Sequence, residues 1–133
     1  EPMLDLARDR AAELGRSVRL LQGNAHTLPF DDACFDTVVC TFGLCAIPDV
    51  DAALAEMRRV LRPGGRLILV DHIESTSRIA RGVQRLLEVA TVPMGGEHFL
   101  RRPSVKVRAL GFEVEQVERF KAGLVERLVA RKP

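Results

Sequence analysis

The chain has 133 residues, of which 47% are hydrophobic and 29% charged, and its formal net charge is +2. This length corresponds to one domain that can bury a core without disulfides or metals. The near balance of charge and the absence of Trp and Tyr exclude a basic, base-stacking surface for nucleic acid. No apolar run approaches the ~18 residues of a membrane helix, so no membrane partner is expected.

Three cysteines at irregular spacing, Cys34, Cys40 and Cys45, form neither a CxxC motif nor a set with metal-ligand spacing. This pattern favours a reduced, cytoplasmic setting and predicts no metal site. No signal peptide is recognisable.

The first elements are a helix and two short strands. Residues 3–14 are predicted to be helical because apolar side chains recur on one face, and Gly15 would end the helix. A strand is expected at 18–21, followed by a turn at 23–25. A second strand is expected at 36–41, where successive apolar residues are typical of a strand buried on both faces.

The middle of the chain predicts another helix and strand. Asp49 or Asp51 can cap a helix that runs to about Leu61, with apolar residues at helical spacing. Pro63-Gly64-Gly65 is expected to stop this helix. The apolar strand 66–70 follows, and Asp71 and His72 come directly after it.

The last part of the chain predicts two helices and an antiparallel hairpin. An amphipathic helix is expected at 76–92, a loop at 93–97 and a short helix at 103–110. Two strands with alternating apolar and polar residues are expected at 112–120 and 124–129. Alternating strands and helices predict an α/β fold with a parallel sheet, to which the hairpin adds an antiparallel edge. Ligands of such sheets bind beyond the carboxyl ends of the strands.

Three segments carry a family resemblance: residues 28–30, residues 35–39 and the run Leu61-Arg62-Pro63-Gly64-Gly65-Arg66-Leu67. Together they resemble class I S-adenosylmethionine-dependent methyltransferases, in the small-molecule group similar to the ubiquinone/menaquinone methyltransferases. The segment 40–45 with Asp71-His72 is also similar to methyltransferase-like proteins that act on small thiols. The resemblance covers residues 1 to about 74. It implies a Rossmann-like enzyme that uses S-adenosylmethionine and a small-molecule acceptor.

The resemblance implies an adenine-binding side at the start of the chain. Met3 matches the residue that packs against the adenine, although it can equally be a core residue of the first helix. Gly23, Asn24 and Ala25 match the loop whose side-chain oxygen accepts from the adenine amino group. Asn24 keeps one acceptor oxygen where the family usually has Asp, and it also suits a plain turn.

The resemblance places the methionine part of the cofactor along Thr41, Phe42 and Gly43, which can also form an ordinary turn after the strand. It places the acceptor pocket at Asp71 and His72. His72 is the candidate base because imidazole changes protonation near neutral pH, and Asp71 is its catalytic neighbour. A hydrogen-bonded histidine at a strand end is the alternative interpretation.

The chain departs from the family at its start. The glycine-rich cofactor loop after the first strand and the acid that ends the second strand are not in this sequence. The family sheet has the order 3-2-1-4-5-7-6, so the strand at 18–21 would lie two strands away, about 10 Å, from the strand at 36–41. We therefore expect a single methyltransferase domain, residues 1–133, that is N-terminally incomplete and lacks the first two strands.

Three explanations of this gap stay open: further residues upstream of Glu1, a second copy of the chain, or a rearranged sheet. Two functional hypotheses follow from them. One is a small-molecule methyltransferase. The other is a truncated or domain-swapped, inactive fragment that acts only through self-association or partner binding, for example as a homodimer. A dinucleotide-binding module is a weak third option because no glycine fingerprint is present.

Overall fold

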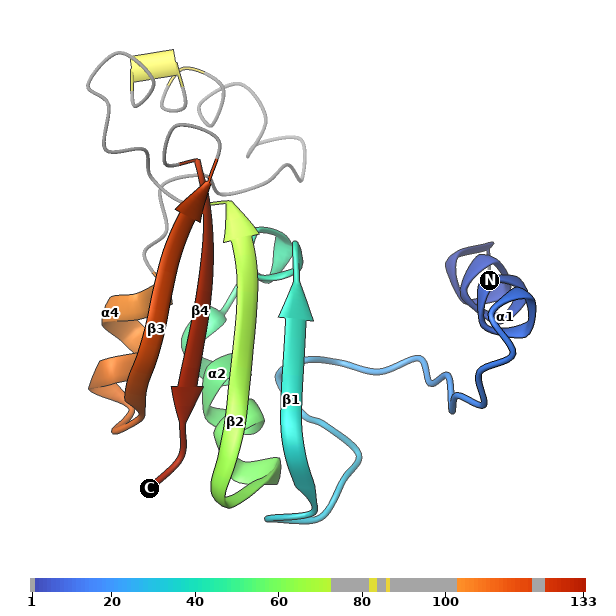
Figure 1. Ribbon diagram of the computed structural model, residues 1–133, viewed down its shortest axis with the longest axis horizontal. Helices are drawn as coiled ribbons and strands as arrows, with labels where there is room; N and C mark the ends of the chain where they lie inside the picture. Colours follow the sequence, from blue (N-terminus) through green and yellow to red (C-terminus); the bar gives the residue numbers. More distant parts are fainter. Residues whose placement is uncertain (1, 73–81, 84–85, 87–102, 121–123) are drawn as a thin grey trace.

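A four-stranded sheet forms the body of the computed structural model, which describes residues 2–72, 82–83, 86, 103–120 and 124–133 (Figure 1). The strands are β1 (Phe35–Thr41), β2 (Leu61–His72), β3 (Glu113–Phe120) and β4 (Val125–Arg131), in the spatial order β1-β2-β4-β3. β1 and β2 are parallel, and the pairs β2–β4 and β3–β4 are antiparallel. The predicted α/β class and the C-terminal hairpin are confirmed.

One face of this sheet is covered by the helices α2 (Val50–Val60) and α4 (Pro103–Ala109), which lie behind it in Figure 1. Alternate residues of β2 point to this face, and Leu67 and Leu69 are 0% and 2% exposed. They join one buried cluster with Leu54 of α2, Val107 of α4 and Leu128 of β4. Burial of each such side chain contributes about 1.5–3 kcal/mol, so this layer holds the sheet and its helices together.

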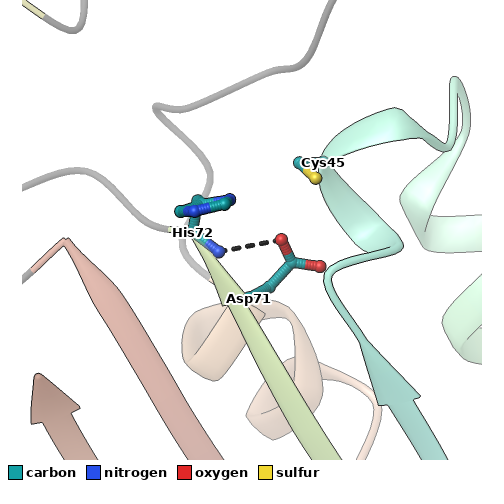
Figure 2. A group of neighbouring side chains, drawn as sticks. All are labelled: Cys45, Asp71 and His72. Carbon is teal, nitrogen blue, oxygen red and sulfur yellow. Dashed lines mark hydrogen bonds between the residues drawn. The ribbon is translucent and has the colours of Figure 1, made fainter.

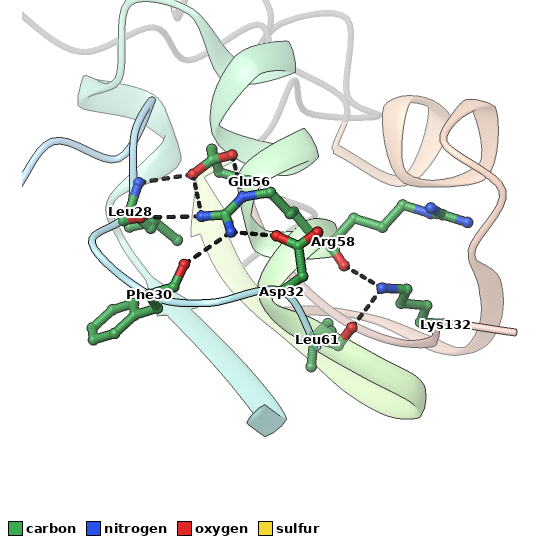
Figure 3. Close-up of polar contacts among 8 residues, drawn as sticks. Leu28, Phe30, Asp32, Glu56, Arg58, Leu61 and Lys132 are labelled. Carbon is green, nitrogen blue, oxygen red and sulfur yellow. Dashed lines mark hydrogen bonds and ion pairs between the residues drawn. The ribbon is translucent and has the colours of Figure 1, made fainter. Parts of the chain in front are cut away.

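α2 begins and ends at polar caps. The Asp49 side chain accepts a hydrogen bond from the Ala52 amide at 3.0 Å, which confirms one of the two predicted caps. At the other end, the Lys132 ammonium donates to the carbonyls of Arg58 (2.8 Å) and Leu61 (2.5 Å). A cation that binds the last carbonyls of a helix stabilises its C-terminus. The end of the chain therefore fixes the end of α2 (Figure 3).

β2 begins earlier than predicted. α2 ends at Val60, before Pro63-Gly64-Gly65, which we expected to stop the helix, and the strand includes these three residues. The Gly64 amide donates to the Lys132 carbonyl at 2.7 Å, and the Lys132 amide donates to the Gly65 carbonyl at 2.9 Å. Gly64 has a φ of +78°, and a Cβ on Gly65 would lie 2.9 Å from the Arg62 carbonyl oxygen. Glycine at these two positions lets the backbone bend while its amide and carbonyl groups continue to pair with Lys132.

A network around Arg59 ties the loop before β1 to α2 (Figure 3). The Arg59 guanidinium donates to the Phe30 carbonyl at 2.8 Å and to the Leu28 carbonyl at 3.1 Å, and it pairs with Asp32 and Glu56 at 2.7 Å each. The Leu28 amide donates to Glu56 at 2.8 Å. Hydrogen bonding to Arg59, then to the Leu28 amide, lowers the pKa of Glu56 to about 2. Periodicity gave no signal for this network.

The N-terminal region differs from the prediction. α1 (Pro2–Glu13) forms as expected, but none of its residues is buried, and it stands apart from the sheet in Figure 1. The strand predicted at 18–21 is wrong: residues 16–23 have no regular structure, and the nearest pairing is a local bridge between Asn24 and Thr27. No described strand is available to pair with this segment, and apolar residues alone do not make a strand.

β1 is also less covered than predicted. It pairs with β2 on one side, and within the described residues its other edge has no strand neighbour. Val39 is 57% exposed, so the prediction of a strand buried on both faces is wrong. The helix predicted at 76–92 and the loop at 93–97 lie largely outside the described residues. Among the described residues, no helix has the length and apolar character needed to cross a membrane.

Candidate functional site

The carboxyl ends of β1 and β2 lie side by side, which brings Phe42 and His72 together. Parallel pairing aligns Thr41 with Val70, and the Phe42 amide then donates to the Val70 carbonyl at 2.7 Å. The rings of Phe42 and His72 face each other at a centroid distance of 5.1 Å and a tilt of 45°. The sheet register therefore joins two of the predicted site residues that are 30 positions apart in the sequence.

Phe42 has an unusual backbone conformation. Its φ is +51°, in the left-handed region that a bulky side chain rarely adopts, and the side chain is 51% exposed. Holding a non-glycine residue there costs about 1–2 kcal/mol, and such strain is concentrated at functional sites. The strained turn aims an apolar ring at the exposed rim of the sheet, next to an imidazole.

Asp71 holds the segment after β1 against the end of β2. It is 1% exposed, and its Oδ2 accepts from the Leu44 amide at 2.6 Å while its Oδ1 accepts from the His72 amide at 2.8 Å. Leu44 begins the short 3-10 helix η1 (Leu44–Ala46). These contacts give Asp71 a positioning role; a direct catalytic role for Asp71 stays a prediction.

Gly43 completes the turn between β1 and η1. A Cβ at this position would lie 3.1 Å from the Cys40 sulfur, so the turn is packed closely against the strand. Burial, followed by the charge of Asp71, raises the pKa of the Cys40 thiol. A half-buried thiol with a raised pKa is a poor nucleophile, in agreement with a packing role for Cys40.

The residues predicted for the adenine side are not gathered at this rim. Met3 is 79% exposed on α1, which is separate from the sheet. The Asn24 Oδ1, the oxygen assigned to adenine, accepts from the His26 amide at 2.9 Å and closes a local turn. Gly23 precedes this turn and Ala25 lies within it. Contact of Met3, Gly23, Asn24 and Ala25 with a cofactor stays a prediction.

The described residues fit one part of S-adenosylmethionine. An exposed aromatic ring such as Phe42 attracts a cation, and the methionine end of this cofactor carries a sulfonium. Thr41 and Gly43 are the chain neighbours of Phe42, at the end of β1 and before η1. The fit covers the methionine end, at the residues where the resemblance placed it, while Met3, on the adenine side, is 79% exposed.

Two features of the site were missed in the sequence. The bond from the Leu44 amide to Asp71 spans 27 positions and has no local signal. Cys45 is 1% exposed and lies near Asp71 and His72, although its spacing in the chain suggested no such group (Figure 2). Parallel register aligns the ends of β1 and β2, but it predicts neither contact, because both depend on where η1 lies relative to the end of β2.

Comparison with known proteins gives the family. The family model described as "Methyltransferase domain" matches residues 1–69. A demethylmenaquinone methyltransferase of Deinococcus radiodurans is 44% identical over 94 residues, which is 71% of this chain and 39% of the relative. A ubiquinone/menaquinone biosynthesis C-methyltransferase of Hahella chejuensis is 38% identical over 96 residues, 71% of this chain and 39% of the relative. The chain thus spans about two fifths of the length of these curated relatives.

Solved structures share the fold. A Bacillus halodurans protein solved as a candidate methyltransferase superposes with a TM-score of 0.83 at 21% identity, over 100% of this chain and 80% of that one. A Thermotoga maritima protein described as a SAM-dependent methyltransferase, possible histamine N-methyltransferase, gives 0.69 at 26% identity, over 93% and 70%. The family match over residues 1–69, more than half of the chain, shows that the chain belongs to the methyltransferase domain family.

Proposed function

We propose that this chain takes part in methyl transfer from S-adenosylmethionine to a small-molecule acceptor at the rim formed by β1 and β2. The observation that carries the proposal is the pairing of the strained, exposed Phe42 ring with the His72 imidazole, at a ring distance of 5.1 Å. This pair lies at the carboxyl ends of two parallel strands, where ligands of such sheets bind. Membership of the methyltransferase domain family supports the same reaction.

Each residue of the rim has a distinct part in this proposal. S-adenosylmethionine supplies a methyl group on a positively charged sulfur. The Phe42 ring attracts that charge and, with Thr41 and Gly43, orients the methionine end. His72 accepts the proton of the acceptor hydroxyl or thiol, which makes the acceptor a better nucleophile. Asp71 keeps the turn and the end of β2 in register through its two backbone bonds.

For the acceptor, we propose a hydroquinone of the demethylmenaquinol type. The support is the 44% identity with a demethylmenaquinone methyltransferase over 94 residues. Loss of a phenolic proton to His72 would make a ring carbon nucleophilic. That carbon would bond the methyl group as the methyl–sulfur bond breaks and S-adenosylhomocysteine leaves, and its own proton would then pass to solvent, which restores the aromatic ring. A small thiol is the second acceptor class, given the similarity of 40–45 and Asp71-His72 to proteins that act on thiols. We place the reaction in the cytoplasm, supported by the three cysteines, which form no disulfide in the described residues.

A two-part experiment tests the proposal. Calorimetric titration with S-adenosylhomocysteine measures cofactor binding, and mass spectrometry measures methylation of a reduced demethylmenaquinone analogue and of a small thiol. We expect one cofactor site per chain. We expect His72→Asn to keep that site and to lower the methylation rate at least about 100-fold, the low end of general-base contributions.

The matched control is His26→Asn, which changes a histidine in the turn before β1 and should retain both binding and rate. Phe42→Ala should weaken cofactor binding. Folded protein that binds no S-adenosylhomocysteine would exclude the proposed activity for this chain. Cofactor binding with equal rates in the two histidine variants would exclude His72 as the base and leave the cofactor assignment intact.

We propose self-association as a second candidate function, because no strand among the described residues pairs with the outer edge of β1. Val39 is 57% exposed on this strand, and α1 presents Met3 and Leu6 at 79% and 64% exposure. An unpaired strand edge with exposed apolar side chains is a template for another strand. A homodimer or a domain swap would cover this edge and would need no catalysis.

Size-exclusion chromatography with light scattering tests the second candidate. We expect a dimer whose fraction falls in Val39→Lys, because a charge on an edge strand opposes strand addition. Val105→Lys, at a 59% exposed position on α4, is the matched control and should leave the dimer intact. A monomer at all concentrations would exclude self-association.

A further inference from the structure

Three side chains with metal-binding atoms meet beside the β1–β2 rim. They are Cys45 of η1 and the last two residues of β2, Asp71 and His72. One ligand atom from each lies within 4.8 Å of the other two, and Figure 2 shows the thiol, carboxylate and imidazole around one space. We propose that this triad binds a thiophilic divalent cation, of which Zn²⁺ is the best match.

The charge of Asp71 supports a cation here. The carboxylate is 1% exposed, and a buried charge is costly without a countercharge. Across the part of the chain that the structure describes, none of the ion pairs that lysine and arginine form includes Asp71. Each carboxylate oxygen accepts one backbone amide, which leaves a lone pair on each oxygen for a metal.

The donor set selects the class of cation. A thiolate, an imidazole and a carboxylate are zinc ligands, whereas Mg²⁺ and Ca²⁺ prefer oxygen atoms alone. Ligand atoms around a tetrahedral zinc lie about 3.5 Å apart. The observed spread of up to 4.8 Å would close by about 1 Å through side-chain rotation of Cys45 and His72. Three protein ligands leave the fourth position for water or another small ligand.

The site connects to the chemistry of the rim. A His72 nitrogen bound to a metal cannot accept a proton, so an occupied site would inhibit general-base use of that nitrogen. This consequence rests on the proposed function. Metal binding itself depends only on Cys45, Asp71 and His72, and it can be measured without an acceptor or a cofactor.

Titration of the reduced, metal-free chain with Co²⁺ tests the proposal, because a cobalt–thiolate bond absorbs in the near ultraviolet and Zn²⁺ then displaces the cobalt. We expect one Co²⁺ per chain with this absorption. Cys45→Ala should abolish the absorption, and His72→Asn should weaken Co²⁺ binding by at least about tenfold, as loss of metal-site contacts does. Cys34→Ala, which changes an exposed cysteine elsewhere, is the matched control and should behave as the unmodified chain.

Far-ultraviolet circular dichroism of each variant checks the fold. If Cys45→Ala does not fold, Cys45→Ser and His72→Asn carry the test. Retention of the thiolate absorption in Cys45→Ala, its loss in Cys34→Ala, or unchanged Co²⁺ affinity in His72→Asn would each overturn the site. Cobalt binding in a chain that binds no S-adenosylhomocysteine would uphold the metal site and reject the proposed methyl transfer.

Discussion

α1 and α2 are helices of 12 and 11 residues with very different surroundings. α1 has no buried residue, whereas α2 buries five, including Leu54 at 0% exposure. Both have apolar residues at helical spacing, and both were predicted. The difference is that α2 lies on a sheet face and α1 does not (Figure 1). Helical periodicity thus predicts the element, while a partner surface decides whether the element contributes to stability.

Their charged side chains show the same contrast. α1 carries two ion pairs, one of them between Arg8 and Asp5, and all four charged side chains are more than half exposed. On α2, Arg59 and Glu56 are 31% and 18% exposed and also bind the loop before β1. Exposed pairs contribute little to stability, whereas a pair that joins two segments orders both. Matched substitutions in the two regions can test this difference.

The largest effect is expected in the core. Leu54→Ala should lower the free energy of unfolding by about 2–5 kcal/mol, because it leaves a cavity under the sheet. Leu6→Ala on α1 is the control and should change it by less than about 0.5 kcal/mol, since Leu6 is 64% exposed. Urea unfolding followed by far-ultraviolet circular dichroism measures both, because the chain has no Trp or Tyr. If both variants lost the same free energy of unfolding, the proposed contrast between α1 and α2 would be wrong.

A smaller effect is expected at the site. Asp71→Asn should lower the free energy of unfolding by about 1–3 kcal/mol, because an amide cannot accept from both the Leu44 and His72 amides as the carboxylate does. Asp5→Asn, on the exposed surface of α1, should leave stability nearly unchanged. The same urea titration measures both variants. If Asp71→Asn left the free energy of unfolding unchanged, the turn after β1 would be held by other contacts.

The smallest effect is a pH dependence at Glu56. Its pKa is lowered from 4.5 to about 2 in the folded chain, so its contribution is complete above pH 4.5 and is lost as the pH falls towards 2. The difference in melting temperature between the unmodified chain and Glu56→Gln should therefore be largest above pH 4.5 and shrink towards pH 2. Glu13→Gln on α1 is the control. A difference that is constant with pH would exclude this titration as its source.

The sequence predicted the parts of the fold that depend on local pattern. The 3.6-residue spacing predicted α1 and α2, and the short helix expected at 103–110 corresponds to α4. The Asp49 cap follows from its position before an apolar helix. The hairpin of β3 and β4 follows from alternation. The strand at 18–21 failed for a non-local reason: it is apolar, but a strand needs a neighbour to accept its hydrogen bonds.

The candidate site was predicted only in part. Its position at the ends of β1 and β2 followed from the order of elements, and Phe42 and His72 do meet there. The bonds of Asp71 and the approach of Cys45 were not predictable, because they depend on how far η1 folds back over β2. The φ of Phe42 was also unpredictable, since sequence pattern favours glycine at such a position.

The strand order has a consequence for how the chain reaches its fold. β4 follows β3 in the sequence, yet it lies inside the sheet between β2 and β3. During synthesis, β2 therefore keeps an open edge until residues 125–131 have emerged, and the last strand has to join the sheet as a central member. A nascent chain that stops before residue 125 would leave the β4-facing edge of β2 unpaired over residues 66–72. A chaperone that covers strand edges would bind there.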